Sequence, residues 1–215
     1  MNKFRTVLFV FAFLLLPVNL IAQDKIISKS KNVCVIRITR EAQGSYDLSW
    51  NQAIDAISAA SKNAQFEDGW IYSPKNHRLY DVGCSNPNTD DGVYMDLKFF
   101  DNNNSLLSGD VAVEIHNHPG TSGGFLDFYP PSFDDMISYY HFLKKFGKEY
   151  HSSLRSIIFD KCGYWEVKLN SNFNPATLSE RGLGSSGTHS RKEMINKYIK
   201  AISAYGVNLT YTERA

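Results

Sequence analysis

The residues best suited to chemistry are two histidines and an acid near the middle of the chain. Segment 114–119 contains His116 and His118, and a Gly-rich stretch separates it from Ser132 and Asp135. Imidazole nitrogens and a carboxylate oxygen are ligands of catalytic zinc, which takes about three protein ligands and leaves one position for water. The sequence therefore predicts a zinc site formed by His116, His118 and Asp135.

The two histidines fall in a predicted strand. Residues 111–116 alternate between β-branched side chains on one face and other side chains on the opposite face. If the chain stays extended beyond this run, His116 and His118 point the same way. Pro119 has no N–H for a ladder and is expected to end the strand. Two imidazoles on one face can bind one ion.

Asp135 is the expected third ligand because of its place in a predicted helix. Residues 130–131 are prolines and Ser132 suits a helix N-cap, with apolar residues at helical spacing from Met136 onward. A carboxylate in the first turn can face back toward a strand end. Ser-x-x-Asp also matches a capping box, and both interpretations of Ser132 can hold together. Asp134 is a rival ligand.

This combination resembles the JAMM metallopeptidases, also called MPN-plus or JAB, whose pattern is a Glu, then His-x-His-Pro, then Ser-x-x-Asp. The resemblance implies zinc ligands at His116, His118 and Asp135 and an oxyanion-stabilising serine at Ser132. It covers about residues 33–168. The chain looks most like the JAB-like domains of secreted bacterial proteins, polymorphic toxins included.

The resemblance also implies a general base, a Glu that follows a helix and precedes the histidines by tens of residues. Glu67 fits, because it follows the amphipathic stretch 49–63 and opens a predicted strand. Glu114 is the alternative, since it shares a strand face with His116 and is either the base or a partner of a histidine. The implied reaction is hydrolysis of an amide bond by a water that zinc activates.

The order of predicted elements indicates an α/β fold, a mixed β-sheet flanked by helices, and the resemblance implies a JAMM/cytidine-deaminase-like core. Loop 120–131 is longer than in the family and suits a flap over the site. The predicted strands are 33–39, 66–72, 79–82, 94–100, 111–116, a hairpin of 156–159 with 164–169, and 207–212 at an edge; the predicted helices are 50–63, one starting after Ser132, and 191–205.

The chain divides into four expected parts. Residues 1–22 predict a secretory signal peptide, with Lys3 and Arg5 before an apolar run. Residues 23–170 form the JAMM-like metallohydrolase domain, 171–190 a linker or long loop, and 191–215 a C-terminal helix and short strand packed on the domain. We therefore expect a protein exported to the periplasm or secreted.

The formal charge and hydropathy bear on the possible partners, and the cysteine count limits the possible disulfides. Removal of residues 1–22 changes the formal net charge from +1 to −1, so no basic surface predicts nucleic acid, and no later stretch is apolar enough to predict a membrane span in the mature form. Cys34, Cys84 and Cys162 allow at most one internal disulfide and leave a free thiol.

Three functions fit this sequence. The first is an exported zinc peptidase or isopeptidase acting on a peptide or protein substrate. The second is a hydrolase of another bond on the same scaffold, because a fold and a metal do not fix the bond that is cleaved. The third is a non-catalytic JAB-like binding module. The oligomeric state is left open.

Overall fold

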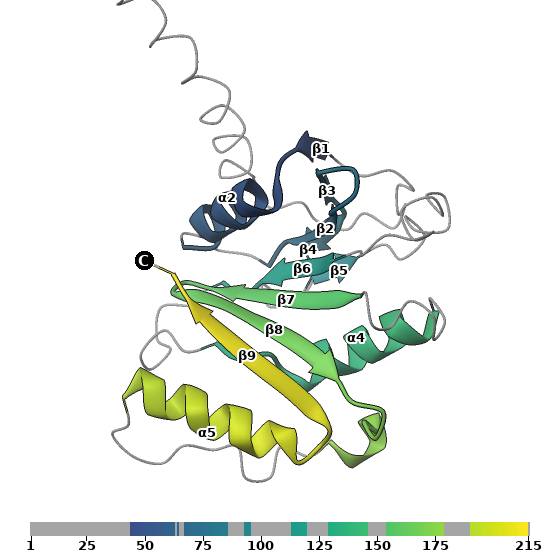
Figure 1. The fold of residues 1–215 in the computed structure, drawn as a ribbon, viewed down its shortest axis with the longest axis vertical. Helices are drawn as coiled ribbons and strands as arrows, with labels where there is room; N and C mark the ends of the chain where they lie inside the picture. The colour runs from purple at the N-terminus through teal and green to yellow at the C-terminus, as the bar shows by residue number, and fades with distance from the viewer. Residues whose placement is uncertain are drawn as a thin grey trace, which may run out of the picture.

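The fold is one seven-stranded sheet with helices on both faces (Figure 1). A computed structural model describes residues 44–62, 64, 67–85, 93–95, 113–119, 129–145, 154–178 and 190–214. In chain order the elements are β1 (Gly44–Asp47), α2 (Trp50–Lys62), β2 (Gly69–Ser73), β3 (Arg78–Asp81), β4 (Gly83–Ser85), β5 (Val93–Met95), β6 (Val113–Asn117), α4 (Phe133–Lys145), β7 (Arg155–Asp160), β8 (Gly163–Leu169), the 3-10 turn η4 (Pro175–Thr177), α5 (Arg191–Ser203) and β9 (Val207–Glu213).

The sheet is mixed, which confirms the predicted α/β class. Its strand order is β1-β3-β2-β6-β7-β8-β9, and β4 pairs with β5 in a separate two-stranded sheet. Strands β6 and β7 are parallel, whereas the other neighbours in the seven-stranded sheet are antiparallel. A parallel pair needs a crossover connection, and the chain between β6 and β7 contains α4. This crossover brings the start of α4 back to the sheet.

Alternate residues of the central strands serve two cores. Ile157 and Phe159 of β7 belong to the core that α2 covers, and Ile158 between them belongs to the core that α4 and α5 cover. All three side chains are fully buried. Burial of a side chain of this size contributes roughly 1.5–3 kcal/mol. The sheet is therefore fixed on both faces around β7 and its neighbour β6, the strand that carries His116.

The C-terminal helix and strand are integral to this core. Ser190 and Glu193 form a reciprocal capping box at the start of α5, and Ile202 of α5 is completely buried. Gly206, with φ of 79°, makes the turn from α5 into β9, where a Cβ would approach Phe173. Phe173 lies in the expected linker, yet it is buried against the α4–α5 core.

Several predicted elements are confirmed and others are corrected. The 156–169 hairpin is confirmed, as are the helices at α2, α4 and α5. Strand β2 begins at Gly69 and not at 66, because its ladder with β6 starts at the Gly69–His116 pair. Residues 94 and 95 of the expected strand 94–100 belong to β5, which starts at Val93 and pairs with β4, and residues 96–100 lie outside the described residues. Strand β1 was not predicted.

Some expectations lie outside the described residues. They include the signal peptide at 1–22, the strand at 33–39, Cys34 and the loop at 120–128. Among the described residues, no helix combines the length and the apolar character needed to cross a membrane.

Candidate metal centre

The two histidines stand at the end of β6. Backbone pairing puts His116 opposite Gly69 of β2 and Ile158 of β7, and the His118 N–H donates a 2.8 Å hydrogen bond to the carbonyl of Phe159. This bond holds the chain beside β7 past the last residue of the strand, so both side chains stay on one face. Their ring centroids are 5.2 Å apart.

The carboxylate comes from the first turn of α4, where Ser132 and Asp135 cap the helix reciprocally. The Asp135 N–H donates to Ser132 Oγ at 3.1 Å, and the N–H and Oγ of Ser132 both donate to Asp135 Oδ2, at 2.6 and 2.8 Å. These bonds are those of a capping box. Asp134, the rival ligand, is exposed and lies outside the group of ligand atoms.

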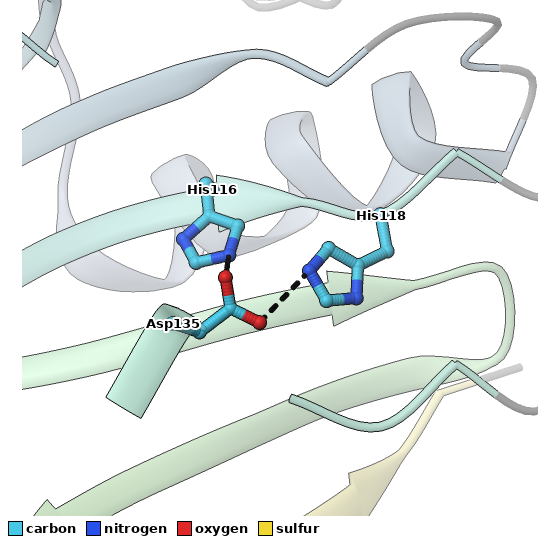
Figure 2. A group of neighbouring side chains, drawn as sticks. All are labelled: His116, His118 and Asp135. Carbon is cyan, nitrogen blue, oxygen red and sulfur yellow. Dashed lines mark ion pairs between the residues drawn. The ribbon is translucent and has the colours of Figure 1, made fainter. Parts of the chain in front are cut away.

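The three predicted ligands turn toward one another (Figure 2). His116 Nε2 lies 3.2 Å from Asp135 Oδ1, and His118 Nε2 lies 3.3 Å from Asp135 Oδ2. One ligand atom of each residue lies within 4.8 Å of those of the other two. Elsewhere in the described ranges, no three His, Cys, Asp or Glu side chains are grouped in this way.

One buried atom tests whether this group fits a metal ion. His116 Nε2 is buried and has no hydrogen bond, because Asp135 Oδ1 stands at ion-pair distance without hydrogen-bond alignment. A buried polar atom without an aligned hydrogen bond costs free energy. A metal ion would accept its lone pair, and two imidazoles with one carboxylate form a donor set of catalytic zinc sites. The group can therefore hold a metal ion.

The electrostatics of the group couple His116 and Asp135. Burial alone would lower the pKa of His116, but the carboxylates of Asp135 and Glu114 raise it well above its ordinary value of 6.5. Burial alone would raise the pKa of Asp135, but the imidazoles of His116 and His118 lower it well below 3.8. In the metal-free chain, a proton on His116 balances the carboxylate charge that a metal ion would otherwise neutralise.

The two candidate bases lie on different sides of the histidines. Glu114 Oε1 is 3.0 Å from His116 Nδ1, the ring nitrogen that faces away from Asp135. Glu67 Oε1 is 4.0 Å from His118 Nε2, the nitrogen that faces Asp135. Glu67 does not open β2 as predicted, since it stands two residues before the strand. Of the two, Glu67 is the carboxylate beside the metal-facing atoms.

Asn117, between the two histidines, holds the segment that carries Glu67. Its Oδ1 accepts a 2.7 Å hydrogen bond from the Asp68 N–H, and its own N–H donates to the Asp68 carbonyl at 3.2 Å. Asn117 is almost fully buried. Sequence reasoning passed over it, although an amide in the middle of His-x-His is a signal that could have been noticed.

Tyr198 links the C-terminal helix to the centre. Its hydroxyl donates a hydrogen bond to the Pro131 carbonyl, immediately before the Ser132 cap. Burial raises the pKa of Tyr198, and the negative charge of Asp135 raises it further. Tyr198 also packs edge-on against Trp165, with ring centroids 6.0 Å apart. Nothing in the sequence marks this contact, because it joins segments far apart in the chain.

Two remaining expectations concern the serine and the cysteines. Ser132 is exposed, and its hydroxyl donates a hydrogen bond to the Asp135 carboxylate. Cys162 is a half-buried free thiol in the β7–β8 turn.

Comparisons with known protein families, with curated proteins and with solved structures found no match for this chain. The geometry of the centre therefore carries the functional argument.

Proposed function

We propose that this protein is an exported zinc-dependent hydrolase of amide bonds, a peptidase or isopeptidase of the JAMM type. The observation that carries the proposal is the convergence of His116, His118 and Asp135, whose ligand atoms lie within 4.8 Å of one another, with the Glu67 carboxylate 4.0 Å from His118 Nε2. These residues come from three separate segments, and a shared metal site would explain why their side chains converge.

The positions of the ligand atoms suggest a role for each residue of the centre. His116 and His118 would hold zinc through Nε2, and Asp135 through its carboxylate. When bound, zinc lowers the pKa of a coordinated water toward about 7 and polarises a carbonyl oxygen. Glu67 would take a proton from the attacking water and return it to the leaving amine. Its carboxylate suits this task because it stands on the metal-facing side of His118.

Ser132 would have two tasks. Its Oγ accepts the Asp135 N–H and donates to Asp135 Oδ2, which orients the carboxylate. The single proton of the hydroxyl can turn to the oxyanion of the substrate once the metal neutralises Asp135. A preorganised donor of this kind is worth about 3 kcal/mol of barrier where it has been removed from other enzymes.

The finer fold and the setting belong to the same proposal. The parallel β6–β7 pair with α4 as its crossover is consistent with a JAMM/cytidine-deaminase-like core. The signal-like segment at 1–22 supports export, and a peptide or protein is the expected substrate.

A peptide library provides the test. The zinc-loaded mature chain, residues 23–215, is incubated with peptides from digested proteomes, and new termini are identified by mass spectrometry. We expect cleavage by the wild type and none by the matched Glu67→Gln variant, which keeps all three ligands. Equal cleavage by both would overturn the assignment of Glu67. Zinc binding without any cleavage of peptides or of branched isopeptides would favour the binding module.

A further inference from the structure

A buried carboxylate lies behind the centre, on the side away from the ligand-facing atoms. Glu114 is two residues before His116 on β6, so the strand places both side chains on the same face of the sheet. The ladder puts Glu114 beside Ile71 of β2 and Ser156 of β7. Glu114 is 8 % exposed and His116 5 %. Such a carboxylate is costly to bury unless it is paired.

The partner of this carboxylate fixes the chemistry of His116. Glu114 Oε1 lies 3.0 Å from His116 Nδ1. An ionised carboxylate only accepts hydrogen bonds, so Nδ1 must carry the proton. In a neutral imidazole, Nε2 then holds the lone pair, and it is the buried Nε2 that faces Asp135 without a hydrogen bond. The contact selects the tautomer that can bind a metal.

We infer that Glu114 is a positioning residue that sets the tautomer and ring orientation of His116 for metal binding. The inference rests on the proposed function, because it assigns a role toward the metal of that site. Glu114 acts through His116 and does not serve as a base, since it contacts the ring edge opposite Nε2. Loss of such an outer partner typically weakens metal affinity by about 10–100-fold.

Two substitutions separate this role from a purely structural one. Glu114→Gln keeps an oxygen that can accept the Nδ1 proton, whereas Glu114→Leu keeps similar bulk and removes the acceptor. Glu166→Gln is the matched control, because Glu166 is a half-buried carboxylate that pairs with Arg155 away from the centre. Each variant is prepared metal-free, and its folding is checked by thermal unfolding.

Zinc affinity is measured by competition with a chromophoric chelator, together with the imidazole proton resonances of the zinc-loaded forms. We expect Glu114→Leu to bind zinc about 10–100-fold more weakly than the wild type, Glu114→Gln to fall between them, and Glu166→Gln to match the wild type. The protected Nδ1 proton signal of His116 should persist in the wild type and the Gln variant and disappear in the Leu variant.

The outcomes distinguish the two proposals. If the wild type binds zinc and both Glu114 variants bind it equally tightly with the Nδ1 signal unchanged, the positioning role is wrong and the metal site stands. If the wild type binds no zinc, the proposed function fails and the role of Glu114 fails with it. Should Glu114→Leu not fold, the zinc affinity of Glu114→Gln decides: weaker binding than the wild type supports the positioning role, and equal binding overturns it.

Discussion

Ser132 and Asp135 are joined by three hydrogen bonds at the start of α4, and the same Asp135 carboxylate faces both histidines of β6. The helix cap thus fixes the position of Asp135, the proposed metal ligand. Two bonds from Ser132 end on Oδ2, so the rotamer of Asp135 is set before any metal arrives. The stability of α4 and the proposed metal site therefore depend on the same turn.

Substitution of the cap should therefore affect more than the helix. We expect Ser132→Ala to lower the free energy of unfolding by about 1 kcal/mol and also to weaken zinc binding. Ser190→Ala is the matched control, because Ser190 caps α5 in a capping box of the same kind away from the centre. Urea unfolding and zinc titration of both variants check this. Equal zinc affinity in the two variants would show that the Ser132 cap does not position Asp135.

The pH dependence of the metal-free chain follows from the raised pKa of His116. The stabilisation by its charged form is fully present below about pH 6.5 and is lost as the pH rises through the higher pKa of the folded state. The pKa of Asp135 is lowered, so the stabilisation by its charged form is lost only as the pH falls through that pKa. Urea unfolding without metal should show that the free energy of unfolding declines from about pH 6 to about pH 9. We expect His116→Gln to remove this decline. An identical decline in that variant would contradict the coupling.

Zinc binding can be tested separately from the positioning of the segment that carries Glu67. Asn117→Ala removes the acceptor of the Asp68 N–H, which we expect to cost about 1 kcal/mol of stability and to reduce cleavage of any peptide found in the library test. Zinc stoichiometry should remain that of the wild type, since all ligands are retained. Asn208→Ala, which removes an exposed amide bonded to Asn170, is the control. Full activity in Asn117→Ala would mean that Glu67 does not depend on this contact.

The C-terminal helix should contribute to the centre through Tyr198. Tyr198→Phe removes the hydrogen bond to Pro131, and we expect a loss of about 0.5–1.5 kcal/mol in stability with weaker zinc binding. Tyr211→Phe removes a hydroxyl bonded to Asp160, away from the ligands, and should reduce stability alone. Calorimetry and zinc titration distinguish the two. Equal zinc affinity in the Tyr198→Phe and Tyr211→Phe variants would mean that α5 has only a structural role.

The three candidate ligands could be predicted from the sequence because the patterns that mark them are local. His-x-His sits on one strand face, and Ser-x-x-Asp sits within one helical turn, so each pair is fixed by the period of its own element. The α/β class followed in the same way from strand and helix periodicity. The meeting of β6 with α4 was expected only through resemblance to a family.

Contacts that join distant segments could not be read from the sequence. The bond from Tyr198 to Pro131 spans 67 residues, and that from Asp68 to Asn117 spans 49. No periodicity marks either pair. The start of β2 was misplaced for a related reason, since its ladder depends on where β6 ends. The sequence leaves Glu67 and Glu114 as rival bases, because it does not show which ring edge of each histidine a carboxylate contacts.

The most direct test of the central claim is the zinc content of the purified mature chain, residues 23–215, after zinc reconstitution and removal of free metal. Two matched pairs isolate the ligands: His118→Ala beside His141→Ala, an exposed histidine of α4, and Asp135→Ala beside Asp134→Ala. We predict about one zinc per chain in the wild type and both controls, with loss in His118→Ala and Asp135→Ala while the fold persists. No bound zinc in the wild type, or equal retention in all four variants, would contradict the metal centre.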